Sequence, residues 1–546
     1  AGLDTGNVRA LTPWQGVRAQ IVSTNPNFPS TMLVSLNLRD RKVADVWRID
    51  LASGAARLDT QNPGDVHGWI ADDNLVVRGA AVTTPDGGAE IRVRDGVHSP
   101  WRAIERVGPE EDLFALDFSR DGRSLIMGSS VGSDTTRLVL RDLHRGRERT
   151  LASSEAADLD DVMIQPTAHI AQAAAFDPGR KKWTVIDPQV RDDFAAFAHF
   201  SGGDFDVVSR DLADRTWIVR SSGDRLPARY YLWDRAHRGA TVLFDSRPKL
   251  EGAELAATQP FDFTARDGMR LHGYLTLPPG FAPKNLPAVI AVHGGPWARD
   301  AWGFNGAIQL LANRGYAVVQ VNYRGSAGYG KKYLHAGDRE WGRAMEDDLV
   351  DAKKWAVDSG VADPNRVAIV GGSYGGYAAL SAAAFHPEVF KCAVDLCGPS
   401  SLFTLFATMP PYWTTSVRKV FIDRVGDPEN PADKAMLTAA SPLFSADKIR
   451  IPILIGQGAH DVRVKPAEAE QMIAAIARNH GRATYVLYSD EGHGLRRPEN
   501  NLDFNARMEK FLADNLGGRF EPMSGDRIAG STAVIEEIGA APPSKR

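Results

Sequence analysis

Cysteine is almost missing from this chain: Cys392 and Cys397 are the two among 546 residues. Two cysteines cannot build the multi-disulfide framework of a small secreted domain or a four-cysteine zinc site. They lie five positions apart, and residues an odd number apart on one strand face opposite sides. We therefore expect both thiols to stay reduced and to bind no metal. This cysteine usage favours a cytoplasmic location, while the start at Ala1 rather than Met leaves an upstream leader open.

Long hydrophobic runs and an excess of one charge are also missing. No apolar run approaches the ~18 residues that a membrane-spanning helix needs, so we expect no membrane partner. The net charge is −4, which gives no basic excess for binding nucleic acid. What the chain does have is length and an ordinary globular composition, with 43% hydrophobic and 24% charged residues. These values predict two or more folded domains.

The first half of the chain repeats short β-rich runs that end in Asp and a polar turn. The runs are VWRID, IRVRD, LVLRD, WTVID and YYLWD, and their closing residues are Asp50, Asp95, Asp142, Asp187 and Asp234. The intervals between these residues are 45, 47, 45 and 47. Such a period in β-rich sequence is typical of propeller blades with four strands each. We predict an all-β propeller over residues 1–255, with about five blade repeats and a further N-terminal segment outside this chain.

From about residue 256 the pattern changes to apolar runs that alternate with helical stretches. The runs "PAVIAVHGG" and "YAVVQVNYRG" are the first two, and four more follow. This alternation predicts a doubly wound, mostly parallel sheet covered by helices over residues 256–520. Functional residues in such a sheet stand at the carboxyl ends of the strands. Residues 521–546 lack firm periodicity, and we predict a mobile or surface-docked C-terminal tail there.

A glycine-rich junction between a strand and a helix is the first sign of chemistry. The stretch "VAIVGGSYGGYAALSAAA" contains Gly371, Ser373 and Gly375 in the spacing Gly-x-Ser-x-Gly. That spacing between strand and helix is typical of the nucleophile elbow of α/β-hydrolases, in which a strained turn exposes the serine hydroxyl. An ordinary glycine-rich turn with a capping serine is the alternative.

A serine nucleophile needs a base and a group that orients the base. In α/β-hydrolases these follow in the chain order Ser, acid, His. Asp461 ends the strand-like run "ILIGQGAHD", and His493 lies in the loop "SDEGHGLRRP". We therefore predict Ser373, Asp461 and His493 as the catalytic triad. We assign no catalytic role to His460, the neighbour of Asp461. Asp490 and Glu491, near His493, are interpreted as solvated acids of the loop.

Acyl transfer also needs hydrogen-bond donors for the developing oxyanion. The backbone N–H after the nucleophile, that of Tyr374, is one expected donor. The other is expected from the loop "VHGGPW", where Gly294 and Gly295 allow backbone amides to approach a substrate. A simple tight turn is the alternative for these glycines.

Together these motifs resemble those of the prolyl oligopeptidase family of serine peptidases, which join a propeller to an α/β-hydrolase. The resemblance rests on "HGGPW" with "NYRGSAGYG", on "GGSYGGY", on "HDVRVK" and on "DEGHG". The chain is most similar to the acylaminoacyl-peptidase and bacterial oligopeptidase branch. The resemblance implies the same triad and oxyanion donors, no cofactor, and short peptides as substrates because the propeller would exclude folded proteins.

The resemblance also implies substrate-binding residues. Arg463 matches the family arginine that holds substrate carbonyls, with a plain ion pair as the alternative. Phe403 and Phe406 match positions that line the pocket before the cut bond, but they serve equally well as core residues. In some branches a tyrosine hydroxyl serves the oxyanion at the position of His293, so backbone donors are expected here instead.

The predicted function is a serine peptidase that cleaves short peptides through an acyl-enzyme. A carboxylesterase or small-amide hydrolase with the same triad is the alternative, because a fold does not determine its substrate. A non-catalytic propeller scaffold is the third interpretation. Dipeptidyl members of the family hold a free amino terminus with paired glutamates, and "GPEEDL" offers Glu110 and Glu111 for that role. Formation of a homo-oligomer stays open.

Overall fold

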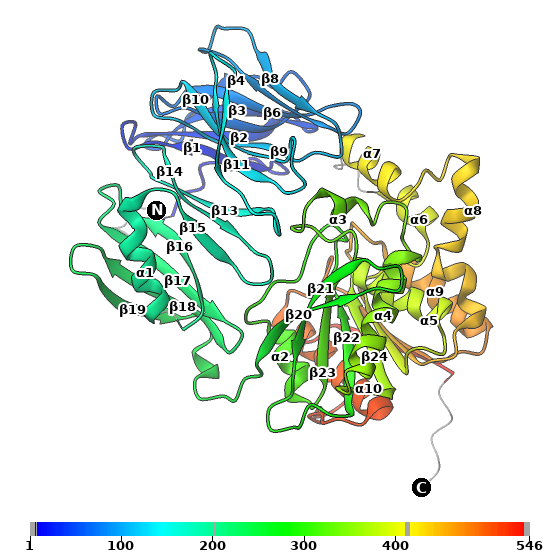
Figure 1. Cartoon of the computed structure of the whole chain (residues 1–546). Coiled ribbons are helices and arrows are strands. Elements are labelled where there is room, and N and C mark those ends of the chain that lie inside the picture. The colour runs from blue at the N-terminus through cyan, green and yellow to red at the C-terminus, as the bar shows by residue number, and fades with distance from the viewer. Residues whose placement is uncertain (1–5, 7, 201, 410–414, 540–546) are drawn as a thin grey trace.

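The computed structural model describes residues 6, 8–200, 202–409 and 415–539. These residues form five small antiparallel sheets in the first half and one nine-stranded sheet in the second half (Figure 1). The last strand of the small sheets ends at Asp245 and the first strand of the large sheet begins at Thr258. The predicted architecture, a propeller followed by an α/β-hydrolase domain, is confirmed.

The small sheets are consecutive in the chain, as propeller blades are. The first two are β1 (Ala19–Thr24), β2 (Thr31–Asp40), β3 (Val43–Asp50) and β4 (Ala56–Thr60), then β5 (Val66–Ala71), β6 (Val77–Thr83), β7 (Ala89–Val93) and β8 (Arg102–Val107). The next two are β9 (Leu113–Phe118), β10 (Ser124–Ser129), β11 (Arg137–Asp142) and β12 (Glu148–Ala152), then β13 (Leu159–Ile164), β14 (Ala171–Phe176) and β15 (Lys182–Val185). The last is β16 (Asp204–Arg210), β17 (Thr216–Gly223), β18 (Leu226–Asp234) and β19 (Gly239–Asp245).

The five periodic aspartates occupy equivalent places in the blades. Each ends the third strand of its sheet or follows that strand by two residues. Four of the five carboxylates accept hydrogen bonds from the N–H groups that follow: Asp50 from Ser53 at 2.7 Å, Asp142 from His144 at 2.9 Å, Asp187 from Gln189 at 3.0 Å and Asp234 from Ala236 at 2.9 Å. At these four positions the spacing reflects a short acidic side chain that satisfies the backbone donors of the residues after the third strand.

The fourth blade differs from the four-stranded prediction. It has three strands, and the short helix η1 (Pro188–Val190) and helix α1 (Arg191–Phe200) follow β15 in place of a fourth. The local sequence favours this change, since Asp187 accepts a hydrogen bond from the Gln189 N–H and Pro188 stands at the first helical position. The stretch "DPQVRDD" thus contains a helix-start signal, whereas the prediction of a fourth strand rested on the repeat period alone.

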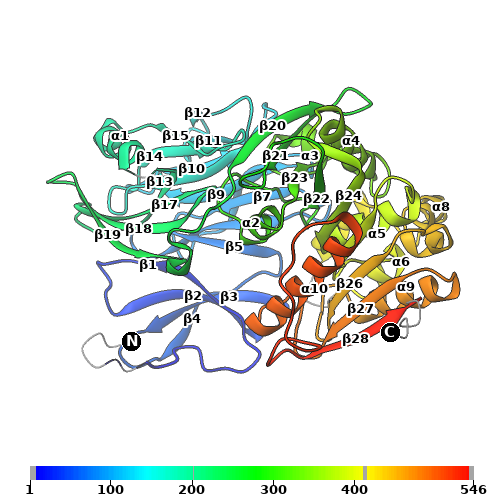
Figure 2. The same ribbon diagram turned by 90° about the horizontal axis from the view of Figure 1, so that it is seen from below.

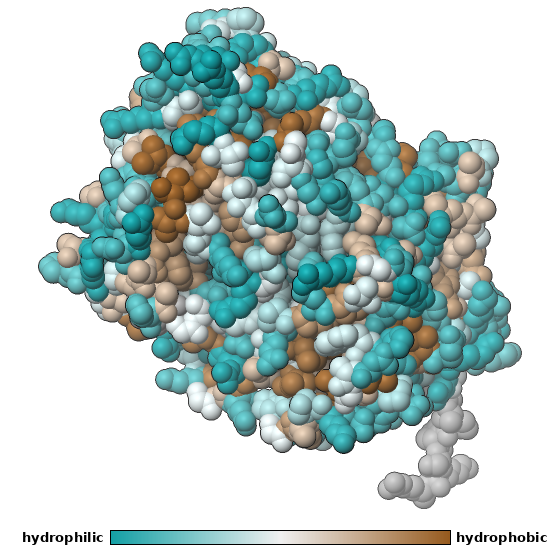
Figure 3. Space-filling view, in the orientation of Figure 1, coloured by the Kyte–Doolittle hydropathy of each residue, from teal (hydrophilic) through white to brown (hydrophobic). Residues whose placement is uncertain are grey.

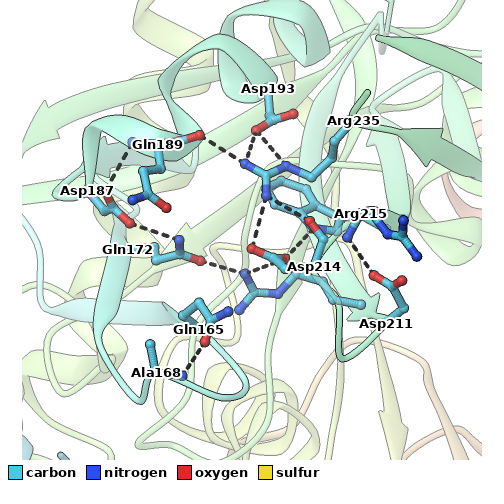
Figure 4. Close-up of polar contacts among 12 residues, drawn as sticks. Gln165, Ala168, Gln172, Asp187, Gln189, Asp193, Asp211, Asp214, Arg215 and Arg235 are labelled. Carbon is cyan, nitrogen blue, oxygen red and sulfur yellow. Dashed lines mark hydrogen bonds and ion pairs between the residues drawn. The ribbon is translucent and has the colours of Figure 1, made fainter. Parts of the chain in front are cut away.

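An ion-paired network joins α1 to the last blade (Figure 4). Arg235 donates to Asp193 of α1 over 2.9 and 3.0 Å and to Asp214 over 3.0 Å. It also donates to the carbonyl of Gln189 at 2.9 Å. One planar guanidinium thus satisfies acceptors from both blades. These contacts stand where a fourth strand would otherwise meet the neighbouring blade.

The large sheet has the order β20-β21-β23-β22-β24-β25-β26-β27-β28. Its strands are β20 (Thr258–Thr264), β21 (Arg270–Thr276), β22 (Leu286–Val292), β23 (Ala317–Asn322), β24 (Ala362–Gly372), β25 (Cys392–Leu396), β26 (Ile453–Gly458), β27 (Ala483–Tyr488) and β28 (Ala533–Ile538). The six strands from β22 to β27 are parallel. Their carboxyl ends therefore lie at one edge, where the loops of the candidate site stand.

Helices cover both faces of the large sheet. From residue 248 onward the helices are α2 (Gly306–Asn313), α3 (Lys331–His335), α4 (Ala344–Asp358), α5 (Tyr374–Phe385), α6 (Leu402–Ala407), α7 (Thr415–Arg424), α8 (Pro431–Ala439), α9 (Pro466–Arg478) and α10 (Pro498–Leu516), with the short helices η2 (Pro248–Leu250) and η3 (Pro442–Lys448). Alternate residues of β22 enter two separate cores. Ile290 packs with residues of α4, α5 and α9, whereas Val289 packs with residues of α2 and α10.

The predicted C-terminal tail needs correction in part. Strand β28, within residues 521–546, pairs with β27 and forms the edge of the large sheet (Figure 2). Ala533 is buried, while Val534 and Ile535 are exposed in part. The alternation of apolar and polar residues in this short edge strand is too weak to predict a strand from the sequence. Residues 540–546 lie outside the described part of the chain.

Hydrophilic side chains cover most of the face shown in Figure 3, and the apolar residues on it form separate patches. Within the described part of the chain, no helix has both the length and the apolar character needed to cross a bilayer.

Candidate active site

Ser373 stands in a strained turn between β24 and α5. Its φ is +58° and its ψ is −120°, a conformation that non-glycine residues rarely adopt. The flanking glycines are required by close contacts. A Cβ at Gly371 would lie 2.3 Å from the Gly375 carbonyl oxygen, and one at Gly375 would lie 2.1 Å from that of Val292. These approaches let α5 pass close to the sheet while the serine side chain stays half-exposed at its edge.

The structure brings Ser373, His493 and Asp461 together from distant parts of the chain. His493 Nε2 lies 3.0 Å from Ser373 Oγ, across 120 residues, and His493 Nδ1 lies 2.7 Å from Asp461 Oδ2. The Asp461 side chain is fully buried, and 18% of the His493 side chain is exposed. Asp461 Oδ1 accepts hydrogen bonds from the backbone N–H groups of Arg463 and Val464 at 2.8 and 2.9 Å. Both carboxylate oxygens therefore have partners that hold the acid in place.

Glu491 holds the loop that carries His493, although the sequence analysis predicted no structural role for it. The interpretation of Glu491 as a solvated residue is wrong, because its side chain is buried. It accepts hydrogen bonds from the N–H groups of Arg496 and Arg497 at 3.0 and 2.9 Å, and from Asn500 at 2.9 Å. The backbone N–H of His460 donates to the Glu491 carbonyl at 2.8 Å, and the exposed His460 lies outside the triad. Glu491 is thus a structural anchor for the histidine loop.

The neighbouring acid of this loop is exposed, as interpreted from the sequence. Hydrogen bonds, first from Thr532 and then from Asn500 and Arg497, lower the pKa of Asp490 to about 2. Thr532 lies just before β28, so this carboxylate links the histidine loop to the last strand.

Two backbone segments near Ser373 offer N–H donors. The N–H of Tyr374 begins α5, where helical N–H groups lack intrahelical acceptors and the helix dipole is positive. Gly294 packs against the serine: a Cβ there would lie 3.3 Å from Ser373 Cβ. The N–H of Gly295 has no acceptor among the described residues. The structure thus brings Tyr374 and Gly294 to the nucleophile, and Gly295 follows Gly294 in the chain.

The predicted substrate residues have different environments. Arg463 is exposed, and its backbone bond to Asp461 places it beside the triad. Phe403 is half-buried with its ring 6.0 Å from that of Phe444. Phe406 is only 2% exposed and belongs to the core of the sheet. Its ring lies 6.2 Å from that of Phe421, on α7.

Trp297 is an aromatic residue of the same region that the sequence analysis missed. It lies two positions after Gly295, and its ring packs edge-on against Phe421 at 5.0 Å. The signal was its place in "HGGPW", two positions after the glycine pair. Trp297 and Phe421 thus connect the loop of Gly294 and Gly295 to Phe406.

One group of side chains at the site has the spacing of metal ligands. Atoms of Cys397, Asp461 and His493 lie within 4.8 Å of one another. Burial, with added effects from Asp395 and Asp461, raises the pKa of the Cys397 thiol to about 12. A protonated thiol is a poor metal ligand, and the other two groups already bond to each other. Cys397 and Cys392 are both free and buried.

The propeller contacts the loops around the site. Lys331 at the start of α3 donates to Glu111 at 2.7 Å, and the Gly330 N–H donates to Asp158 at 3.0 Å. Arg299, from the loop after Trp297, donates to the carbonyl of Asp177 at 2.8 Å. Figure 1 shows α3 on the side of the hydrolase domain that faces the propeller. The propeller therefore touches the hydrolase domain at α3 and at the loop that follows Gly294 and Gly295.

Comparisons with known proteins agree with this geometry. The family model described as prolyl oligopeptidase family matches residues 302–519. Dipeptidyl aminopeptidase BIII of Pseudoxanthomonas mexicana is 43% identical over 542 residues, which are 97% of this chain and 78% of that protein. Dipeptidyl peptidase family member 6 of Caenorhabditis elegans is 35% identical over 558 residues, covering 96% of this chain and 75% of that protein.

Solved structures extend the likeness to both domains. The crystal structure of a puromycin hydrolase superposes with a TM-score of 0.76 at 21% identity, covering 94% of this chain and 80% of that chain. At this identity the likeness shows the fold alone. Together with the two curated relatives, it confirms the resemblance inferred from the motifs. The chain belongs to the prolyl oligopeptidase family of serine peptidases.

Proposed function

We propose that Ser373 is the nucleophile of peptide hydrolysis, that His493 is its general base and acid, and that Asp461 orients the imidazole. The supporting observation is the continuous pair of hydrogen bonds from Asp461 through His493 to Ser373. A carboxylate only accepts hydrogen bonds, so His493 Nδ1 carries the hydrogen and Nε2 presents its lone pair to the serine hydroxyl. That is the tautomer a base needs.

The reaction follows from this arrangement. Ser373 Oγ attacks the peptide carbonyl carbon while His493 takes the hydroxyl proton, and the carbonyl oxygen becomes an oxyanion. The N–H groups of Tyr374 and of the glycine pair Gly294 and Gly295 stabilise that charge. His493 then gives its proton to the leaving amine, which leaves an acyl-enzyme. A water molecule, deprotonated by His493, releases the acyl group and restores the serine.

The triad has a direct chemical test. A fluorophosphonate should react with the native protein, and peptide mapping should place the label on Ser373. His493→Ala should lose nearly all labelling, because the hydroxyl then has no base. A label on another serine, or unchanged labelling in the variant, would contradict these roles.

The finer proposal is release of dipeptides from short peptides that have a free amino terminus. It is supported by the names of two curated relatives above 30% identity, a dipeptidyl aminopeptidase and a dipeptidyl peptidase family member. The contacts of the propeller with α3 and with the loop that follows Gly294 and Gly295 support short substrates, since the propeller would exclude folded proteins. Glu111 is engaged by Lys331, so it is not a free acceptor for the substrate amine, and Glu110 is exposed.

A panel of anilides tests this specificity. Free dipeptidyl anilides should be cleaved well, and the same dipeptides with an acetylated amine or a single amino acid should be cleaved poorly. Faster cleavage of acetylated substrates would instead indicate an acylaminoacyl-peptidase. Cleavage of p-nitrophenyl esters alone would indicate an esterase.

A further inference from the structure

His293 directly precedes the oxyanion glycines, and both of its ring nitrogens have partners. Nδ1 lies 2.8 Å from the carbonyl oxygen of Gly294, and Nε2 lies 3.0 Å from Ser326 Oγ. A carbonyl oxygen only accepts, so Nδ1 carries the hydrogen of this contact. Burial lowers the pKa of His293 more than nearby Asp300 raises it, which favours the neutral ring. The Ser326 hydroxyl is shared between two acceptors, Nε2 and the Tyr323 carbonyl oxygen, which lies 2.7 Å from Oγ.

The imidazole is fixed by one tyrosine. Tyr323 is fully buried, and its ring stacks on that of His293 with centroids 4.5 Å apart and an interplanar angle of 17°. Its hydroxyl lies 3.0 Å from the His293 carbonyl oxygen and 3.2 Å from Nδ1. Because Nδ1 carries a hydrogen toward Gly294, the hydroxyl donates to the carbonyl. The same ring lies 5.2 Å from the ring of Tyr374, whose N–H is the other oxyanion donor. Tyr323 therefore packs against both halves of the oxyanion site.

The contact with Gly294 determines where the next amide points. In a trans peptide the carbonyl oxygen and the amide hydrogen point in opposite directions, so a Gly294 oxygen turned toward His293 directs the Gly295 N–H away from it. Gly294 packs on the serine, since a Cβ there would lie 3.9 Å from Ser373 Oγ. Gly295 is exposed, and its N–H has no acceptor among the residues that the structure describes.

We propose that His293 is a positioning residue. It holds the Gly294 carbonyl and thereby directs the Gly295 N–H toward the substrate oxyanion, which forms when Ser373 attacks the peptide carbonyl. This inference rests on the proposed function and adds a residue to it. It also selects Gly295, within the glycine pair, as the donor. A histidine that only fills space would be replaced equally well by any side chain of similar volume.

Two amide variants separate these roles. The side-chain N–H of His293→Asn replaces Nδ1 and can still donate to Gly294, whereas His293→Gln places its amide near Nε2. For each variant we would measure kcat and KM on a dipeptidyl anilide. We would also measure the inhibition constants of a dipeptide aldehyde, whose hemiacetal places an oxygen in the oxyanion site, and of the product dipeptide, which forms no such adduct. His272→Asn, at a histidine of β21 bonded to Asp262, is the matched control.

The expected result is a change in kcat and in aldehyde binding alone. His293→Gln should lower kcat about ten- to a hundredfold, below the loss for a deleted oxyanion donor. The aldehyde should bind more weakly by a similar factor, with KM and the product constant within about twofold. His293→Asn should retain most of the activity, and His272→Asn should match the native protein.

Equal kcat values for the two His293 amide variants would overturn the inference, as would equal weakening of aldehyde and product. If His293→Gln fails to fold, Ser326→Ala replaces it, because that variant removes the Nε2 partner and should lower kcat with aldehyde affinity in the same way. Failure of the proposed function is distinct: the native protein would then lack turnover and fluorophosphonate labelling.

Discussion

Lys331 of the hydrolase domain donates a hydrogen bond to Glu111 of the propeller over 2.7 Å, and Ser130 donates to the other carboxylate oxygen over 2.5 Å. Burial raises the pKa of Glu111, but these two hydrogen bonds outweigh it and leave the pKa below its usual value. A double-mutant cycle with Lys331→Met and Glu111→Gln should give a coupling of about 1 kcal/mol, the value for a partly exposed charged hydrogen bond. Thermal unfolding measures it, and additive effects of the two changes would show that the contact does not stabilise the interface.

The propeller and the triad were accessible from the sequence because local signals define them. Asp50 and Asp234 satisfy the donors of their own turns, so the repeat survives as a spacing of single residues. The elbow around Ser373 likewise needs small residues within two positions of the nucleophile.

Other features depend on contacts between distant parts of the chain and could not be predicted. Glu491 is buried because Asn500 and the turn at Arg496 close over it, although its sequence neighbours are polar. Phe406 is a core residue because α7 packs on it, which the spacing of "SLFTLF" cannot reveal. Strand β28 could not be predicted either, because it forms only by pairing with the distant strand β27.

Arg463 should separate peptide hydrolysis from ester hydrolysis. Its side chain is exposed beside the triad, and a guanidinium can donate two hydrogen bonds to substrate carbonyls. Arg463→Ala should lower kcat/KM for dipeptidyl anilides roughly ten- to a hundredfold and change p-nitrophenyl acetate hydrolysis far less. Arg463→Lys should restore only part of the loss. Equal losses on both substrates would mean that Arg463 supports the Asp461 loop instead.

Asp461→Asn tests the orientation of the imidazole. The amide can donate to His493 Nδ1, which favours the tautomer with the hydrogen on Nε2 and removes the base that faces Ser373. We expect kcat to fall by about 10⁴-fold, with a small change in KM. The variant Asp490→Asn, in the exposed acid of the histidine loop, should keep kcat within about threefold. A loss of less than tenfold in Asp461→Asn would contradict the orienting role.

Asp395, on β25, should make stability depend on pH. Burial raises its pKa to about 7, although the Gly398 N–H donates to it at 2.7 Å. An unfolded aspartate titrates near pH ~4, so between about pH 4 and 7 the folded state holds one proton more than the unfolded state. Stability from this residue is therefore lost as the pH rises through that window, by on the order of 4 kcal/mol.

Asp395→Asn should remove this loss because the amide does not ionise. Relative to the native protein, the melting temperature of the variant should increase between pH 5 and pH 8. A difference in melting temperature that is the same at both pH values would show that Asp395 is not the titrating group.

The central claim is that Ser373 carries out the hydrolysis, and turnover by Ser373→Ala tests it most directly. The half-exposed hydroxyl can be removed without opening a core cavity, so the variant should unfold at the temperature of the native protein. With a dipeptidyl anilide its kcat should be lower by roughly 10⁴-fold or more, and adding His493→Ala should cost little further because triad members act as a unit. A folded Ser373→Ala protein with kcat within tenfold of the native value would contradict the account.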